Sequence, residues 1–335
     1  MSALTATSLL DIDRQPGKPP IVRIDVAADA ATWMAENRAM LLDLVANQGS
    51  VRVRGLELRD ADEVVTVFQK IAPNLMVERE AFAARRTYSD RVYSSATWPA
   101  NQPMCMHHEL SYASRFPGLM IFACLTAPAT GGATAVADAT AVLEALPADL
   151  VRRFEQEGWL LTRNYTDEIG VSPADAFGTN DRAAIEEYCR ANAIEFEWRS
   201  DGGLRTHQRR SAIVHHPVTD QRCWFNQIAF LNEWTIDPEV REFLVDMYGP
   251  EGLPFNTSFG NGDPIGADVV QTVNQVYDAN TAREPWAAGD VLLVDNIHTA
   301  HSREAFEGPR EILVAMADAQ TRTSNMSVTV EDAST

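Results

Sequence analysis

A histidine- and glutamate-containing segment is the part of this sequence best suited to chemistry. His107 and Glu109 lie two residues apart in the run MHHEL, and His301 lies far downstream in the run DNIHTAHSREAFEGPRE. Two imidazoles and one carboxylate are the ligands of the facial triad that holds Fe(II) and leaves coordination positions open for oxygen and a cosubstrate. In a strand, residues i and i+2 point to the same side, so His107 and Glu109 would share one metal while His108 points away.

The segments around these residues read as strands that could position them. The run QPMCM precedes His107, and the run GDVLLVDN precedes His301. A third run, GPREILVAMA, carries Arg310 near its start. A guanidinium at this place can hold a carboxylate in a bidentate pair of fixed geometry. If Arg310 faces inward, alternation also turns Ile312 and Val314 inward and Glu311 outward.

Three segments of the chain together resemble a known family. The chain is similar to the taurine dioxygenase/clavaminate synthase-like branch of the Fe(II)- and 2-oxoglutarate-dependent oxygenases. Within it, the sequence most resembles amino acid hydroxylases of nonribosomal peptide pathways, of the syringomycin-pathway aspartate hydroxylase type. The matching segments, within about residues 100–320, are HHELSYASRFPGLMIFACLTAPATGGATAVADATAVLEALP, AIVHHPVTDQRCWFNQIAFLNEW and GDVLLVDNIHTAHSREAFEGPREILVAMAD.

This resemblance implies roles for individual residues. His107, Glu109 and His301 would be the iron ligands, and Arg310 with Thr134 would bind the distal carboxylate of 2-oxoglutarate. Many relatives carry two adjacent arginines where this chain has Arg310 followed by a glutamate. The cosubstrate role is therefore assigned to Arg310 alone, and Arg303 is the alternative.

The resemblance also implies a fold and a reaction. The fold would be mixed α/β, with a double-stranded β-helix (jelly-roll-like) core and flanking helices. The reaction would use Fe(II), 2-oxoglutarate and O2 to hydroxylate an amino acid or an amino-acid-derived substrate, free or tethered to a peptidyl carrier protein, in antibiotic or other natural-product biosynthesis. Related halogenases lack the carboxylate that this chain keeps at Glu109, which favours hydroxylation over halogenation.

Other functions fit part of the same pattern. The metal centre could instead catalyse desaturation or epoxidation, or the chain could be a non-catalytic barrel that binds a metal or an acid. A zinc hydrolase would use the same ligands but would leave Arg310 without a role.

Composition limits the possible partners and compartment. The net charge is −19, from 28 basic and 47 acidic residues, which argues against nucleic acid or an anionic membrane as a partner. No apolar run reaches the length of a membrane span, and the first residues lack the pattern of a secretion signal. The four cysteines are scattered, without metal-type or disulfide spacing. These features predict a cytoplasmic protein.

The chain reads as one domain with appended segments. We expect a loose arm over residues 1–20, a single oxygenase domain over 21–322 and a frayed tail over 323–335. The least regular part, 164–205, is predicted to be an insertion that acts as a lid over the site, with an ordinary surface elaboration as the alternative. Periodicity predicts helices at 30–47, 60–73, 137–158 (broken at Pro147), 181–193, 237–249 and 266–281.

A few remaining polar residues are candidates for substrate binding. A local basic cluster could recognise a carboxylate or a phosphopantetheine arm, although a solvated face is the simpler interpretation; it consists of Arg205, His207, Arg209 and Arg210. Asn226 and Gln227 could line the pocket or satisfy buried backbone groups. His215 and His216 are interpreted as structural, and Cys105 as a small buried apolar residue.

Overall fold

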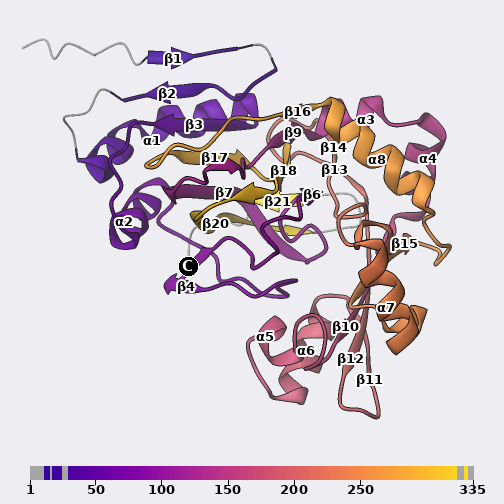
Figure 1. Ribbon diagram of the computed structural model, residues 1–335. Coiled ribbons are helices and arrows are strands. Elements are labelled where there is room, and N and C mark those ends of the chain that lie inside the picture. The colour runs from indigo at the N-terminus through magenta and orange to yellow at the C-terminus, as the bar shows by residue number, and fades with distance from the viewer. Residues whose placement is uncertain (1–10, 16, 25–28, 323–327, 331–335) are drawn as a thin grey trace, which may run out of the picture.

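The computed structural model describes residues 11–15, 17–24, 29–322 and 328–330, and their fold is mixed α/β (Figure 1). The predicted helices are confirmed within a few residues, and the 137–158 segment is split at Pro147 as expected. The helices are α1 (Ala30–Gln48), α2 (Ala61–Ile71), α3 (Ala139–Ala145), α4 (Ala148–Glu157), α5 (Pro173–Phe177), α6 (Arg182–Ala191), α7 (Pro238–Tyr248) and α8 (Ala267–Ala279), with 3-10 turns at Glu233–Thr235 and Pro250–Gly252.

Local chemistry explains where these helices begin and end. The side chain of Asp29 accepts a hydrogen bond from the backbone N–H of Thr32 and caps α1. Gly49 ends α1 with φ of 74°, a left-handed conformation that glycine adopts without a steric penalty. Asp60 caps α2 in the same way, and two acidic residues lie in its first turn.

A nine-stranded sheet forms one layer of the molecule. Its strands follow the order β1-β2-β3-β17-β7-β20-β5-β4, with β21 paired to β20. Helices α1 and α2 pack on one face of this sheet, and the metal centre lies on the other. The strands are β1 (Asp11–Asp13), β2 (Ile21–Arg23), β3 (Ser50–Arg54), β4 (Thr87–Ser89), β5 (Val92–Ser94), β7 (Arg115–Thr126), β17 (Val291–Asp295), β20 (Glu311–Arg322) and β21 (Val328–Val330).

Alternation along the strands divides the buried residues between the two faces. Ile312 and Val314 of β20 belong to the core on the metal-centre side, whereas Leu313 packs under the helices. The predicted inward orientation of Ile312 and Val314 is therefore confirmed. Glu311 lies outside that core and accepts a hydrogen bond from the hydroxyl of Tyr88 (2.6 Å).

A four-stranded sheet carries the metal-binding strands. Its order is β16-β9-β18-β6, and its apolar residues share the core on the metal-centre side of the large sheet. Its strands are β6 (Met104–His107), β9 (Val136–Asp138), β16 (Thr281–Ala282) and β18 (Thr299–Arg303). Two further two-stranded antiparallel sheets are formed by β8 (Thr130–Gly131) with β19 (Phe306–Glu307), which are distant in sequence, and by the hairpin of β13 (Ile213–His215) with β14 (Arg222–Trp224).

A further four-stranded sheet builds the unit seen at the bottom of Figure 1. Helices α5 and α6 pack with this sheet around a separate small core that includes Tyr165 and Leu204. The predicted insertion limits, 164 and 205, fall inside β10 and β12, which pair with each other, so the unit extends beyond them. Its strands are β10 (Trp159–Tyr165), β11 (Glu195–Trp198), β12 (Leu204–Arg210) and β15 (Phe255–Phe259).

Short strands lie near both ends of the described residues. Residues 11–13 form β1 and pair with β2, so this part of the expected loose arm is a strand. Residues 328–330 of the expected tail form β21 and pair with β20. The predictions for 1–10, 16, 323–327 and 331–335 lie outside the described residues. None of the described helices is long and apolar enough to cross a membrane.

Candidate metal centre

The three predicted metal ligands meet at one buried point. His107 ends β6, His301 lies on β18, and the two residues are direct partners in the antiparallel pair. Glu109 lies in the turn after β6. One potential ligand atom from each of the three residues lies within 4.8 Å of the others, and all three residues are buried.

The reason for this geometry differs from the predicted one. Strand β6 ends at His107, so Glu109 does not share a strand face with it. Asn296 instead clamps the turn: the Glu109 N–H donates to Asn296 Oδ1 (2.7 Å), and Asn296 Nδ2 donates to the Glu109 carbonyl (2.9 Å). His108 points elsewhere as expected, with Nδ1 lying 2.6 Å from the carbonyl oxygen of Asn296.

The donor atoms of this group fit a divalent metal. Nδ1 of His107 lies 2.8 Å from the carbonyl oxygen of Cys105, so it donates its hydrogen there and leaves Nε2 free for a metal. Burial lowers the pKa of His107 to about 3, which keeps the imidazole neutral. Oε1 of Glu109 is buried and has no hydrogen-bond partner among the described residues. Two imidazoles and a carboxylate suit Fe(II).

Arg85 is a further residue of the site, not predicted from the sequence. Its guanidinium lies 3.2 Å from Oε2 of Glu109 and 3.0 Å from Oε1 of Glu78, and all three side chains are buried. Burial opposes ionisation of Glu109, but Arg85 and the two histidines outweigh it and lower the pKa of Glu109 to about 2. The carboxylate is thus ionised and ready to bind a metal at neutral pH.

Arg310 lies in the same small cavity as the metal ligands, a space of about 40 Å³. Its Nε donates to the carbonyl of Gly132 (3.0 Å), and its terminal nitrogens lie 3.4 Å from Oγ of Ser95 and 3.5 Å from Oγ1 of Thr134. Among the described residues it has no carboxylate partner. Burial and the nearby charge of Arg303 lower the pKa of Arg310 to about 10, so it is still a cation at neutral pH. An anionic ligand would complete this site.

A chain of contacts orients the hydroxyl of Thr134. Its Oγ1 accepts a hydrogen bond from Nε1 of Trp286 (3.3 Å) and a longer one from Arg310, which leaves its own hydrogen available to a ligand. The Trp286 ring lies 4.2 Å from the guanidinium of Arg52, which is paired with the buried Asp290 at 3.0 Å. Thr134 was predicted from the sequence as a cosubstrate residue, whereas Trp286 was not.

Arg303, the alternative cosubstrate residue, has a different position. Its terminal nitrogens donate to three backbone carbonyls of the loop before β6, those of Trp98, Pro99 and Gln102. Although Arg303 also borders the small cavity, its guanidinium is used to hold this loop. The geometry therefore favours Arg310 over Arg303 as the residue that binds the cosubstrate.

The predicted basic cluster does not form one surface. Arg209 is exposed, whereas Arg210 is buried on the opposite face of β12 and donates to the carbonyl of Tyr112 (2.7 Å). Arg205 donates to Oδ1 of Asn164 (2.9 Å) and to a backbone carbonyl. None of these arginines, nor His207, lines the metal centre or the neighbouring cavity that Phe82 and Phe230 border. The structure therefore gives them no contact with a substrate there.

The predicted polar candidates of the 213–228 region are structural. Asn226 donates to the carbonyl of Ala212 (3.0 Å) and accepts from the N–H of Ile228. Gln227 donates to the carbonyl of His108 (2.8 Å). His216 lies 2.9 Å from a carboxylate oxygen of Asp295, in agreement with its structural interpretation. Alternation could not identify these roles, because each partner is distant in the sequence or lies in a turn.

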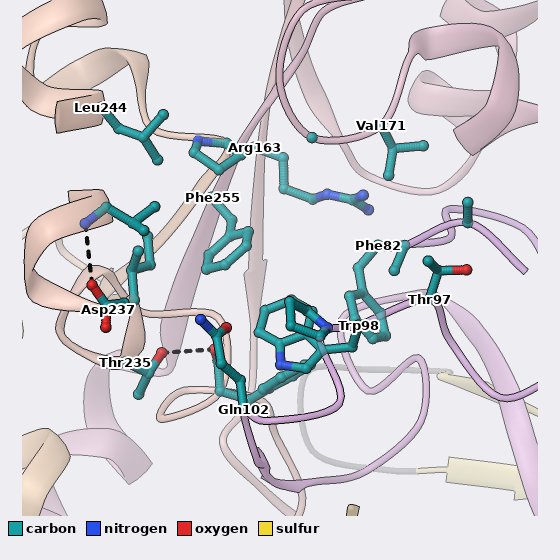
Figure 2. A pocket seen from close by; sticks show the side chains of 18 of the residues that line it. Phe82, Thr97, Trp98, Gln102, Arg163, Val171, Thr235, Asp237, Leu244 and Phe255 are labelled. Atoms are coloured by element: carbon teal, nitrogen blue, oxygen red, sulfur yellow. Dashed lines mark hydrogen bonds between the residues drawn. The ribbon is translucent and has the colours of Figure 1, made fainter. Parts of the chain in front are cut away.

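A cavity of about 530 Å³ lies beside the metal centre; we call it the apolar cavity (Figure 2). The ring of Phe230 at its wall stacks on His107, with centroids 4.6 Å apart, and Phe82 packs edge-on against Phe230 at 5.0 Å. Cys105 borders the same cavity, and burial raises the pKa of its thiol to about 11. Neither aromatic residue was predicted from the sequence, although Phe230 lies within one of the three segments that resemble the family.

Comparisons with known proteins identify the family of the chain. The model of the family "Taurine catabolism dioxygenase TauD, TfdA family" matches residues 13–316. The chain is 31% identical over 276 residues to the dapdiamide synthesis protein DdaC of Enterobacter agglomerans, covering 82% of this chain and 84% of that protein. It is 27% identical over 284 residues to a clavaminate synthase-like protein of Arabidopsis thaliana, covering 82% of each.

Solved structures show the same fold. A taurine dioxygenase from Burkholderia xenovorans superposes with a TM-score of 0.55 at 14% identity, over 97% of this chain and 95% of that one. PvcB, described as an Fe, alpha-ketoglutarate dependent oxygenase from an isonitrile synthetic pathway, gives 0.52 at 14% identity, over 95% and 94%. The chain belongs to the TauD, TfdA family and is an Fe(II)- and 2-oxoglutarate-dependent dioxygenase.

Proposed function

We propose that this dioxygenase hydroxylates an amino acid or an amino-acid-derived substrate in natural-product biosynthesis. The observation that carries the proposal is the complete metal triad beside Arg310, a partly buried arginine with no carboxylate partner among the described residues, with Glu109 retained. The name of DdaC, a dapdiamide synthesis protein, supports the biosynthetic setting. We also interpret the two facing sheets around the metal centre as a double-stranded β-helix, with the nine-stranded sheet as its larger side.

Different residues of the site would bind Fe(II) and 2-oxoglutarate. His107, Glu109 and His301 would hold Fe(II), which when bound activates O2 together with 2-oxoglutarate for attack on a C–H bond. Arg310 would pair with the distal carboxylate of 2-oxoglutarate through its terminal nitrogens, and Thr134 would donate its hydroxyl hydrogen to the same group. Arg85 keeps Glu109 ionised and fixes its orientation. The burial of these groups excludes bulk water from the reacting atoms.

The test is oxygen uptake coupled to succinate formation. The chain loaded with Fe(II) should consume O2 and 2-oxoglutarate together, and a panel of amino acids and their carboxyl derivatives should stimulate this consumption. A product that gains one oxygen atom identifies hydroxylation of a C–H bond, whereas loss of two hydrogens identifies desaturation. Activity with Zn(II) in place of Fe(II), or no coupled consumption with any substrate, would contradict the proposal.

A further inference from the structure

The chemistry of the apolar cavity indicates what kind of substrate it takes. The identity of this substrate rests on the proposed function, because a substrate in the cavity would have to reach the metal centre. Three chain segments border both spaces: Ala84 faces the apolar cavity and Arg85 the metal centre, and the same division holds within segments 95–98 and 102–105. The two spaces are therefore adjacent, with His107 and Phe230 at their boundary.

The walls of the apolar cavity would match a large apolar group. Figure 2 shows Phe82, Trp98, Phe255, Val171 and Leu244 arranged around it. A volume of about 530 Å³ lies within the range of roughly 300–1,000 Å³ that is typical of small-molecule sites. Because most of the wall is aromatic or aliphatic, binding of a small polar amino acid such as aspartate would leave much of this surface without a contact.

The charges at the cavity disfavour a carboxylate. Arg163 is the only cation among the described residues that line it, and it is buried with its two terminal nitrogens donating to the carbonyls of Glu80 (2.8 Å) and Ala81 (2.7 Å). Asp175 and Asp237 line the same cavity and are exposed. A substrate carboxylate would thus meet two like charges and an arginine already engaged with the backbone, whereas a substrate ammonium group would be attracted.

The remaining polar groups of the wall are neutral. The side-chain amide of Gln102 and the hydroxyl of Thr97 have no hydrogen-bond partner among the described residues, and both border the cavity. An amide and a hydroxyl can donate to and accept from an uncharged acyl group. Arg163, by contrast, is held in place by its backbone contacts and by the ring of Tyr165, 4.6 Å from its guanidinium.

We infer that the substrate is an amino-acid derivative with a large apolar side chain and a carboxyl group masked as an amide or thioester. The apolar side chain would occupy the aromatic part of the wall, and the masked carboxyl group would meet Gln102. The free amino group would lie toward Asp237, which Figure 2 shows on the same side of Trp98 as Gln102. This class includes an aminoacyl thioester on a carrier and excludes a free dicarboxylic amino acid.

Equilibrium dialysis against the chain loaded with Fe(II) and 2-oxoglutarate, without oxygen, tests this inference with four probes. They are L-phenylalaninamide, L-phenylalanine, N-acetyl-L-phenylalanine and L-alaninamide. L-Phenylalaninamide should bind about ten- to a hundredfold more tightly than L-alaninamide, because burial of the phenyl group drives binding. It should also bind about tenfold more tightly than either free acid, because a buried unpaired carboxylate is costly.

A matched pair of lysine substitutions on α7 sharpens the test. Val240 borders the cavity and Phe243 does not, yet both are exposed, at 45% and 60%, so both substitutions should be compatible with folding. Val240→Lys should weaken binding of L-phenylalaninamide and strengthen that of N-acetyl-L-phenylalanine. Phe243→Lys should change neither by more than about twofold, because exposed charges interact weakly.

Three results would overturn the inference: tighter binding of N-acetyl-L-phenylalanine than of the amide by the unchanged chain, no binding of the amide at millimolar concentration, or equal effects of the two lysines. The first would make Arg163 the carboxylate-binding residue. A chain that couples O2 to 2-oxoglutarate but prefers free acids retains the proposed function and loses this inference. A chain that binds the amide as expected but never consumes 2-oxoglutarate keeps the cavity chemistry and loses the proposed function.

Discussion

The metal centre and the apolar cavity are neighbours built in opposite ways. Residues from paired strands and a clamped turn form the metal centre, and its charged groups are buried and bonded to one another. Loops and α7 form much of the apolar cavity, and none of the eleven described residues of α7 is buried. The contrast indicates that the reaction chemistry is fixed by the rigid sheets, whereas substrate choice is left to segments with weaker packing.

The largest effect is expected at the metal centre. His107→Ala or His301→Ala should abolish turnover and remove bound iron, because each deletes one of three ligands. His108→Ala should retain iron while lowering stability, since His108 is buried and bonded to the carbonyl of Asn296. Iron content after desalting, measured together with turnover, separates the two classes. Equal iron loss in the His108 variant would mean that the ligand assignment is wrong.

The next effect distinguishes the two arginines that border the metal cavity. Arg310→Lys should raise the KM for 2-oxoglutarate about ten- to a hundredfold, because charge-assisted hydrogen bonds contribute about 1.5–3 kcal/mol and lysine cannot form the planar bidentate pair. Arg303→Lys should leave this KM nearly unchanged and weaken substrate binding, since Arg303 holds the loop of Trp98. The reverse pattern in steady-state kinetics would transfer the cosubstrate role to Arg303.

A smaller effect is expected one step away from the cosubstrate. Trp286→Phe preserves the ring beside Arg52 but removes the N–H that fixes the hydroxyl of Thr134. The KM for 2-oxoglutarate should rise about two- to tenfold with little change in kcat, as for loss of one neutral hydrogen bond. Trp234→Phe, at an exposed tryptophan outside the small cavity, is the control. A fall in kcat alone would argue against a role in orienting Thr134.

The smallest effect concerns a carboxyl group behind the apolar cavity. Burial raises the pKa of Glu80, although the hydroxyl of Tyr188 and the amide of Gln208 donate to it. At pH values above the ordinary pKa of glutamate, Glu80 keeps its proton in the folded state, whereas the unfolded chain has released it. The free energy of unfolding therefore falls as the pH rises toward the pKa of Glu80 in the folded state. Urea unfolding should give a lower free energy of unfolding at about pH 8 than at about pH 5, and Glu80→Gln should make this difference smaller. A drop of equal size in both proteins would contradict this.

Sequence patterns predicted what depends on local periodicity. Helix α2 was recognisable from its acidic first turn and apolar spacing, and Pro147 marked the break between α3 and α4. The metal ligands were identified from residue type, but the strand-alternation argument for Glu109 was wrong because β6 ends before it. Its position depends on Asn296, a partner 187 residues away, which no local pattern records.

The remaining site residues were hidden for the same physical reason. Arg85 lies among several arginines in the run REAFAARR, and only its buried contact with Glu109 distinguishes it. Arg210 was grouped with Arg209 because they are adjacent, yet adjacent residues of a strand face opposite sides. Residues that act through long-range contacts, such as Trp286, require the fold before their role can be inferred.

The hydrogen bonds from Arg303 to the loop before β6 bear on how new substrate specificities could arise. Arg303 holds the loop through the carbonyls of Trp98, Pro99 and Gln102, groups that every amino acid carries. The side chains at Trp98 and Gln102 can therefore vary through mutation without releasing the loop from β18, the strand that also carries His301. An enzyme anchored in this way can exchange substrates over evolutionary time, or in a directed library, while its metal ligands stay in place.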